Sequence, residues 1–330
     1  MSIHLTGVIM SVSVANAVTA SPADPEFLDN GGRKVDLDRL KGVFPENIKT
    51  VAVLNAASIP NAEQVRLGLM MLERAGLKVK VMPHTFDKAP ENRKSIPLPK
   101  RMADFKAAWC DPEVDMIIST RGGKGAQDVV ARMDWSELKK KNDPVVMGFS
   151  NITCVTTAMI SKGAGYPIQG PNFCTLVKCE DESIEYLKAV LHKETPPSIK
   201  LTALRPGKCS GRIYAGHLAM LNLMNKGEFK FDPAGRVIFL ECVRRKEREL
   251  MLHFNSLLNT GFFDKAAGVV LCHFSRSFTT EEAKLNFFRR MAEKLNCPVY
   301  YGFPYGHELN INALDFQRTA VIADGTLTIK

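Results

Sequence analysis

The feature that most constrains the fold of this chain is an alternation of short apolar runs with amphipathic segments between residues 50 and 161. In residues 62–75 the apolar side chains recur at helical spacing, and Gly76 follows where a helix C-cap is expected. This alternation predicts βαβ units and a parallel sheet, which binds ligands beyond the carboxyl ends of its strands. The expected strands are 50–55, 77–82, 114–119 and 144–148, and the expected helices are 62–75, 100–109, 127–133 and 152–161.

The length of 330 residues is more than one hydrophobic core usually supports, so we expect two domains. The fold class is α/β, with an N-terminal Rossmann-like parallel-sheet domain and a smaller C-terminal α/β domain. Glycines and prolines interrupt residues 163–200, apart from one amphipathic helix near 183–192, which indicates a linker. The expected division is a leader or possible signal with an N-terminal extension at 1–49, a first domain at 50–165, a linker at 166–200 and a second domain at 201–330.

The second domain also alternates strands with helices. A strand at 237–240 runs straight into Glu241, and a strand at 298–301 leads toward His307. Residues 319–322 and 327–329 are expected to pair as a hairpin through Asp324-Gly325, a strong turn signal. The other elements expected here are helices at 247–258 and 281–294 and a strand at 267–272.

The composition is basic, because Lys and Arg exceed Asp and Glu by 44 − 35 = +9. Such a balance suits a nucleic acid, an anionic surface, an acidic substrate or simply a solvated surface. The basic residues are spread along the chain and no nucleic-acid-binding motif is present, so no nucleic acid partner is expected. No run is long and apolar enough to predict a membrane span.

The eight cysteines form no C-x-x-C pair, and a chain of this size does not need a disulfide framework. We expect them to be free thiols, and no short-spaced Cys/His cluster predicts a metal. Residues 5–20 are mostly apolar or small and Val18-Thr19-Ala20 resembles a signal cleavage site, yet only His4 stands where a positive n-region belongs. Cytoplasmic and periplasmic locations therefore both stay open.

Two turns follow the third and fourth expected strands. In Gly148-Phe149-Ser150-Asn151 a serine stands at a strand-to-helix turn, where free N–H groups and the helix dipole suit an oxyanion. The motif resembles the G-x-S-x-G elbow without its second glycine, and on this motif alone a helix N-cap is the more common role. The other turn, Arg121-Gly122-Gly123-Lys124-Gly125, either brings a backbone N–H close to a ligand or is simply tight.

A serine hydroxyl needs a base to act as a nucleophile, and the base needs an orienting carboxylate. Among the seven histidines, His307 lies in a loop constrained by Gly302, Pro304 and Gly306, which can fix a side chain well. Glu241 ends an apolar run, where a carboxylate is costly unless it is paired. Its alternative role is a structural ion pair with Arg244 or Arg245.

Taken together, these motifs resemble the LD-carboxypeptidases, whose relatives include the microcin C immunity peptidases. That family carries an R-G-G-Y-G turn, a G-[FY]-S-D-[IL]-T elbow, an L-E strand end and a G-x-P-x-G-H loop, in this order. The resemblance covers about residues 50–330. The matching stretches are 121–125, 148–153, 240–241 and 302–307, and Gln169-Gly170-Pro171 matches a further family signature.

The resemblance implies a catalytic triad at the domain junction, with Ser150 as nucleophile, His307 as base and Glu241 as orienting carboxylate. It also implies an oxyanion hole from the N–H groups of Gly123 and Asn151, and acyl transfer that requires no metal or cofactor. The implied enzyme is a serine carboxypeptidase of peptidoglycan recycling that releases the terminal D-Ala of murein tetrapeptides at an L,D-amide bond. The implied partner is a murein peptide, and a homodimer is one option for the assembly.

Some positions depart from the family pattern. Lys124 replaces the usual Tyr, Asn151 the usual Asp and Cys242 a common acidic residue, while His217, expected on a helix, stands where Asn is usual. Gly122, Lys124 and His217 are expected to contact the substrate. The departures leave two alternatives, a microcin-immunity-like amidase acting on a peptidyl- or aminoacyl-nucleotide and a non-catalytic peptide-binding homologue. The scarcity of aromatic residues in 171–200 disfavours the amidase.

Overall fold

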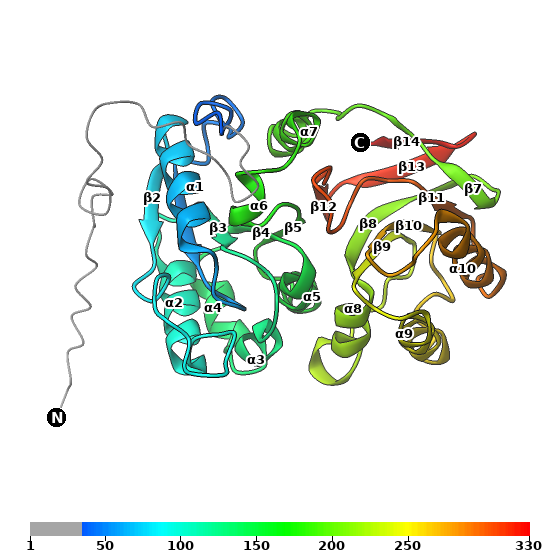
Figure 1. Cartoon of the computed structure of the whole chain (residues 1–330), viewed down its shortest axis with the longest axis horizontal. Helices are drawn as coiled ribbons and strands as arrows, with labels where there is room; N and C mark the ends of the chain where they lie inside the picture. The colour runs from blue at the N-terminus through cyan, green and yellow to red at the C-terminus, as the bar shows by residue number, and fades with distance from the viewer. Residues whose placement is uncertain (1–34) are drawn as a thin grey trace.

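The computed structural model describes residues 35–330, so the signal-like stretch 5–20 lies outside the described residues. It has two β-sheets side by side, each flanked by helices, with the N-terminal half of the chain on the left of Figure 1 and the C-terminal half on the right. This arrangement confirms the predicted α/β class with a parallel sheet and a second sheet domain. Within the described range, no helix combines the length and apolar character that a membrane span requires.

The first sheet has six strands in the order β12-β5-β4-β3-β1-β2. Five of them are parallel, as the βαβ pattern predicts. The exception is β12, a two-residue strand from the C-terminal half of the chain that pairs antiparallel with β5. The strand bounds are β1 Thr50–Leu54, β2 Lys78–Val81, β3 Met116–Ser119, β4 Val145–Gly148, β5 Tyr166–Gln169 and β12 Leu314–Asp315.

Both faces of this sheet are buried, because successive side chains of a strand point to opposite faces. In β1, Val51 and Val53 pack into one apolar cluster, whereas Ala52 and Leu54 pack into another. The first cluster includes residues of α1, α6 and α7, and the second includes residues of α2, α3, α4 and α5. The helix bounds are α1 Ala62–Arg74, α2 Leu98–Cys110, α3 Ala126–Val130, α4 Trp135–Lys141, α5 Thr153–Lys162, α6 Phe173–Leu176 and α7 Asp181–Leu191.

The second sheet has eight strands in the order β6-β14-β13-β8-β9-β10-β11-β7. Its central four, β8 Cys209–His217, β9 Arg236–Val243, β10 Gly268–Ser275 and β11 Val299–Tyr301, are parallel. The hairpin of β13 and β14 forms as predicted, with Asp324 and Gly325 both at positive φ. The remaining bounds are β6 Ile199–Lys200, β7 Thr202–Arg205, β13 Thr319–Ala323, β14 Thr326–Ile329, α8 Leu218–Met224, α9 Glu247–Asn259 and α10 Glu281–Glu293.

Two segments expected to lie outside the folded domains are part of them. The start of the expected linker forms β5, which Pro167 concealed in the sequence. A proline fits there because β12 pairs only with Ile168 and Gln169, so the missing N–H falls beyond that pairing. The end of the expected leader, residues 35–49, buries Leu40 and Val43 in the core although it is polar on average.

Candidate active site

Ser150 lies two residues after the end of β4 and opens a short 3-10 turn that leads into α5. Its φ of 63° lies in the left-handed region, which a residue with a Cβ occupies at a cost and which is common at functional turns. Phe149 precedes the turn as its N-cap residue, and no side-chain cap hydrogen bond forms there. The hydroxyl of Ser150 faces His307 instead of capping the helix.

The glycine turn after β3 presses against Ser150. A Cβ on Gly122 would lie 2.7 Å from Cβ of Ser150, 2.9 Å from its Oγ and 3.2 Å from the backbone nitrogen of Asn151. Gly123 has a φ of 111° and leaves no room for a side chain beside Ser58. Only glycine lets this backbone approach the serine so closely.

A buried arginine that the sequence analysis missed holds the same turn. Arg101 on α2 donates from Nη1 to the carbonyl oxygens of Gly125 at 2.6 Å and Ala56 at 3.2 Å. Its Nε donates to the carbonyl oxygen of Ile96 at 3.1 Å. The apolar helical pattern around Arg101 was the available signal, because a buried guanidinium needs partners.

Ser150, His307 and Glu241 form one hydrogen-bonded chain. The distance from Ser150 Oγ to His307 Nε2 is 2.9 Å, and that from His307 Nδ1 to Glu241 Oε2 is 2.8 Å. Glu241 is fully buried near the end of β9, whereas the side chain of His307 is 20% exposed. The structure thus brings together three residues that lie far apart in the sequence.

Gly306 makes the approach of His307 to Glu241 possible. Its φ is 135°, and an added Cβ would lie 2.9 Å from Cβ of His273 and 3.1 Å from Cβ of Glu241. A side chain at this position would push the loop away from β9.

The carboxylate of Glu241 is held in its charged form. Burial alone would raise its pKa, but the charges of His307 and His217 and the hydrogen bond from His307 outweigh burial and lower it. Neither Arg244 nor Arg245 forms an ion pair with Glu241 among residues 35–330, so the expected alternative pairing is absent there.

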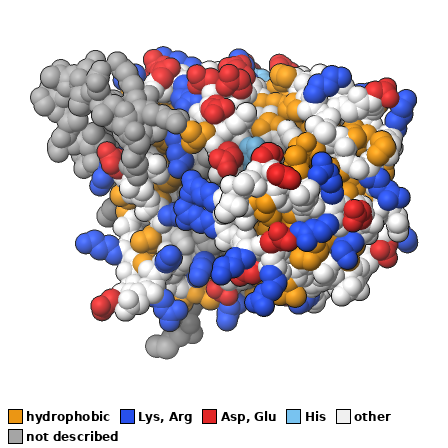
Figure 2. Space-filling view, turned by 45° about the vertical axis from the view of Figure 1, so that its right-hand side comes forward, with side chains coloured by type: hydrophobic (Ala, Val, Ile, Leu, Met, Phe, Trp, Pro, Cys, Tyr) orange, Lys and Arg blue, Asp and Glu red, His pale blue; other side chains and the backbone are white. Residues whose placement is uncertain are grey.

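Figure 2 shows basic and acidic side chains mixed over the face displayed, with a histidine in a hollow of that face.

His217 lies at the end of β8, not on a helix as expected, because the helical pattern begins only at Leu218. It stands opposite Glu241 in the neighbouring strand, and its ring centroid is 6.0 Å from that of His307. Burial lowers the pKa of His217 to about 4. Its Nε2 lies 3.5 Å from Sγ of Cys242, while its buried Nδ1 has no protein partner within the described part of the chain.

Two other positions, Asn151 and Lys124, also depart from the family pattern. Asn151 turns its side chain away from Ser150, and its Oδ1 accepts from the backbone N–H of Ala126 at 2.8 Å. An aspartate could accept the same bond, but it could not donate as Nδ2 of Asn151 does to Oε1 of Gln127 at 3.4 Å and to Sδ of Met220 at 2.9 Å. Lys124 is exposed, and its backbone N–H donates to Oγ of Ser58 at 3.0 Å.

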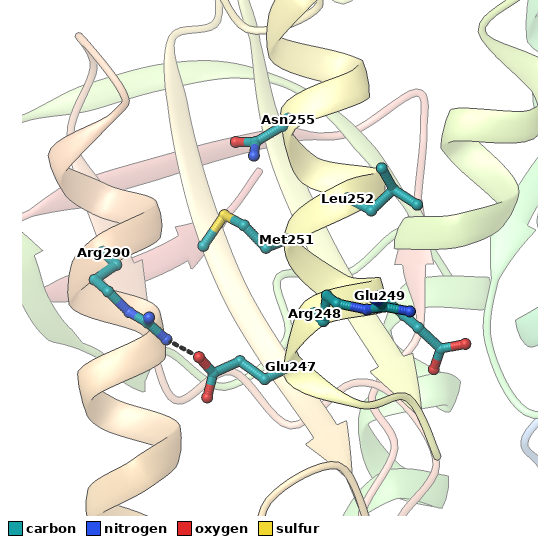
Figure 3. Close-up of a pocket in the computed structure, with 7 residues that line it drawn as sticks. All are labelled: Glu247, Arg248, Glu249, Met251, Leu252, Asn255 and Arg290. Atoms are coloured by element: carbon teal, nitrogen blue, oxygen red, sulfur yellow. Dashed lines mark hydrogen bonds and ion pairs between the residues drawn. The ribbon is translucent and has the colours of Figure 1, made fainter.

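A hollow between α9 and α10 lies apart from the hydrogen-bonded Ser150, His307 and Glu241. Figure 3 shows its lining, with Arg290 of α10 paired to Glu247 of α9. None of Ser150, His307 and Glu241 lines it.

All eight cysteines lie in the described range, and none of them is in a disulfide.

Comparisons with known proteins match both halves of the chain. Residues 51–168 match the LD-carboxypeptidase N-terminal domain and residues 210–322 match the LD-carboxypeptidase C-terminal domain. A probable murein peptide carboxypeptidase of Bacillus subtilis is 27% identical over 292 residues, which cover 81% of this chain and 89% of that protein.

Two solved structures share the fold. The muramoyltetrapeptide carboxypeptidase of Oxalobacter formigenes aligns with a TM-score of 0.74 at 18% identity, over 85% of this chain and 98% of that one. MccF, the microcin C7 self-immunity protein, in complex with glutamyl sulfamoyl guanosine aligns with a TM-score of 0.74 at 16% identity, over 87% of this chain and 97% of that one.

Proposed function

Because this chain belongs to the LD-carboxypeptidase family of serine peptidases, we propose that it releases the terminal D-Ala of murein tetrapeptides by hydrolysing an L,D-amide bond. The observation that carries the mechanism is the hydrogen-bonded chain of Ser150, His307 and Glu241. Its distances of 2.9 and 2.8 Å lie within the range for general-base catalysis. The murein-directed names of relatives support the substrate class.

In the first half of the reaction, Oγ of Ser150 attacks the carbonyl carbon of the scissile amide. Nε2 of His307 accepts the hydroxyl proton, and the carboxylate of Glu241 stabilises the imidazolium through Nδ1. The carbonyl oxygen becomes an oxyanion, which the N–H groups of Gly123 and Asn151 would bind. The close contact of Gly122 with Ser150 and with the nitrogen of Asn151 supports this pair of donors.

In the second half, His307 returns its proton to the nitrogen of the leaving D-Ala, and an acyl-enzyme remains on Ser150. Water then loses a proton to His307 and attacks the ester carbonyl. As the bond to Ser150 breaks, His307 returns this proton to Oγ of Ser150 and the shortened peptide leaves. Each step uses the same base, so its contact with Ser150 must survive both halves.

The test is to incubate the purified protein with a murein tetrapeptide and to measure released D-Ala by a coupled assay. We expect release by the wild type and a loss of about 10⁵-fold or more in Ser150→Ala. A wild-type protein that releases no D-Ala from any tetrapeptide would refute the proposal.

Release of glutamate from a glutamyl sulfamoyl nucleoside tests the amidase alternative, since the two structural neighbours share the fold equally well. Cleavage of that compound in preference to the tetrapeptide would favour the amidase. If the wild type cleaves neither compound and Ser150→Ala binds the tetrapeptide as well as the wild type does, the results would favour a non-catalytic peptide-binding protein.

A further inference from the structure

The proposed reacting groups come from two sheets, so their separation depends on how the sheets are joined. Ser150 follows β4 of the first sheet, whereas the loop of His307 follows β11 of the second. A misplacement of about 1 Å can cost about a hundredfold in rate. The contacts that hold the His307 loop against the first sheet therefore bear on catalysis.

Tyr305, two residues before His307, is held by both sheets. Its phenolic hydroxyl donates to Oε1 of Gln169 in β5 at 2.8 Å. Its backbone carbonyl oxygen accepts from the N–H of His273 in β10 at 3.0 Å. The side chain is fully buried, so water does not compete for either contact.

Gln169 connects this tyrosine to the helix that follows the serine. It is the last residue of β5 and stands opposite Gly148 of β4. Its Nε2 donates to Oγ1 of Thr156 at 2.6 Å and lies 3.4 Å from Oγ1 of Thr153. Thr153 is three residues after Ser150, and all of these side chains are buried.

Two further contacts near Gln169 join the two sheets. The hydroxyl of Thr153 also accepts from the backbone N–H of His217 in β8 at 3.0 Å. Downstream of His307, Leu314 of β12 pairs with Gln169 itself, so the chain returns to the first sheet. Figure 1 shows β12 beside β5 between the two halves of the molecule.

We propose that Gln169 and Tyr305 are positioning residues that set the separation of Ser150 and His307, an inference that rests on the proposed function. A carboxamide accepts from the phenol and donates to the α5 hydroxyls at once, a combination that an apolar side chain of the same size lacks. Neither residue contacts the reacting atoms, and both act through the loop of residues 302–315.

Tyr305→Phe tests the inference, with Tyr214→Phe as its matched control. Both substitutions delete one buried phenol that joins the two halves, since the hydroxyl of Tyr214 lies 3.3 Å from Oγ1 of Thr157 on α5. Both should lower the midpoint of thermal unfolding similarly. Only Tyr305→Phe should lower kcat, by about 10- to 100-fold with KM changed less than about twofold.

Gln169→Met removes the amide at nearly constant volume and should lower kcat by a similar factor. In the double variant with Tyr305→Phe, the two losses should not multiply, because either change already breaks the same contact. Equal kcat for Tyr305→Phe and Tyr214→Phe would overturn the inference, as would losses that multiply fully in the double variant.

A measurement without substrate separates this inference from the proposed function. In a crystal structure of Gln169→Met, we expect the distance from Ser150 Oγ to His307 Nε2 to exceed the 2.9 Å of the wild type. An unchanged distance would overturn the positioning role even if the enzyme is active. A wild type that releases no D-Ala would overturn the function, and the crystallographic distance would still decide the positioning role.

Discussion

Glu241 keeps its charge at a place where burial alone would remove it. Burial raises the pKa of a carboxyl group, yet the positive charges that His307 and His217 can carry, together with the hydrogen bond from His307, lower it overall. A charged Glu241 next to Nδ1 fixes the tautomer in which Nε2 is free to accept the proton of Ser150.

Glu241→Gln should therefore lower kcat by about 10³- to 10⁴-fold, because the amide keeps the shape but cannot stabilise an imidazolium. Tetrapeptide hydrolysis gives kcat, and far-UV circular dichroism checks that the variant is folded. A kcat within about tenfold of the wild type would contradict the proposed role of Glu241.

His217 should make the fold sensitive to acid. Burial lowers its pKa from 6.5 to about 4, so the unfolded chain binds more protons than the folded one in this window. Stability from this group is therefore present above pH 6.5 and is lost as the pH falls to 4. At about 1.4 kcal/mol per pH unit, the loss approaches about 3 kcal/mol.

The matched variant is His217→Asn, which places the usual residue of the family at this position. Urea unfolding at several pH values between 7 and 4 gives the free energy of unfolding of both proteins. The stability of the wild type should fall more steeply with acid than that of the variant. Parallel curves would show that His217 does not titrate in this window.

At the scale of elements, the site depends on two turns that follow neighbouring strands and press on each other. Gly122 has an ordinary φ, so Gly122→Ala strains no backbone torsion but places a Cβ 2.7 Å from Cβ of Ser150. The serine must shift, and kcat should fall by about 100-fold. Labelling of Ser150 by a fluorophosphonate should slow in parallel, and retention of the wild-type labelling rate would contradict the contact.

The sequence predicted elements well where local chemistry decides the conformation. Asp324-Gly325 specifies its hairpin because both residues tolerate positive φ, and Gly76 follows α1 at a φ of 84°. The strand β5 and the position of His217 on β8 were missed because they depend on neighbouring strands. A proline inside a strand and a histidine before a helix carry no local signal of their pairing.

For the site, the sequence predicted Ser150, Glu241 and His307 at or after strand ends. It did not predict the residues that hold these three in position. Arg101 and Gln169 look like ordinary polar residues until the fold surrounds Arg101 with carbonyl groups and joins Gln169 to Tyr305. Such contacts span distant parts of the chain, so they depend on tertiary structure and not on local pattern.

At the scale of the whole molecule, the two halves share their cores. The apolar cluster on one face of the first sheet continues into the second sheet, where it includes Phe239 and Val270. The cluster on the other face includes Phe229, whose ring centroid lies 6.5 Å from that of Trp135. With β12 paired to β5, neither half can unfold without exposing apolar surface of the other.

We therefore expect one cooperative unfolding transition, although chains of this size often unfold domain by domain. The two tryptophans, Trp109 and Trp135, both lie in the first half and report mainly on its core, whereas far-UV circular dichroism reports on helices of both halves. In urea, the two signals should give the same midpoint and the same slope. Separate midpoints would show that the halves unfold independently. Weakening the shared core with Phe229→Ala should lower both midpoints together, because a contact that couples two units destabilises them as one.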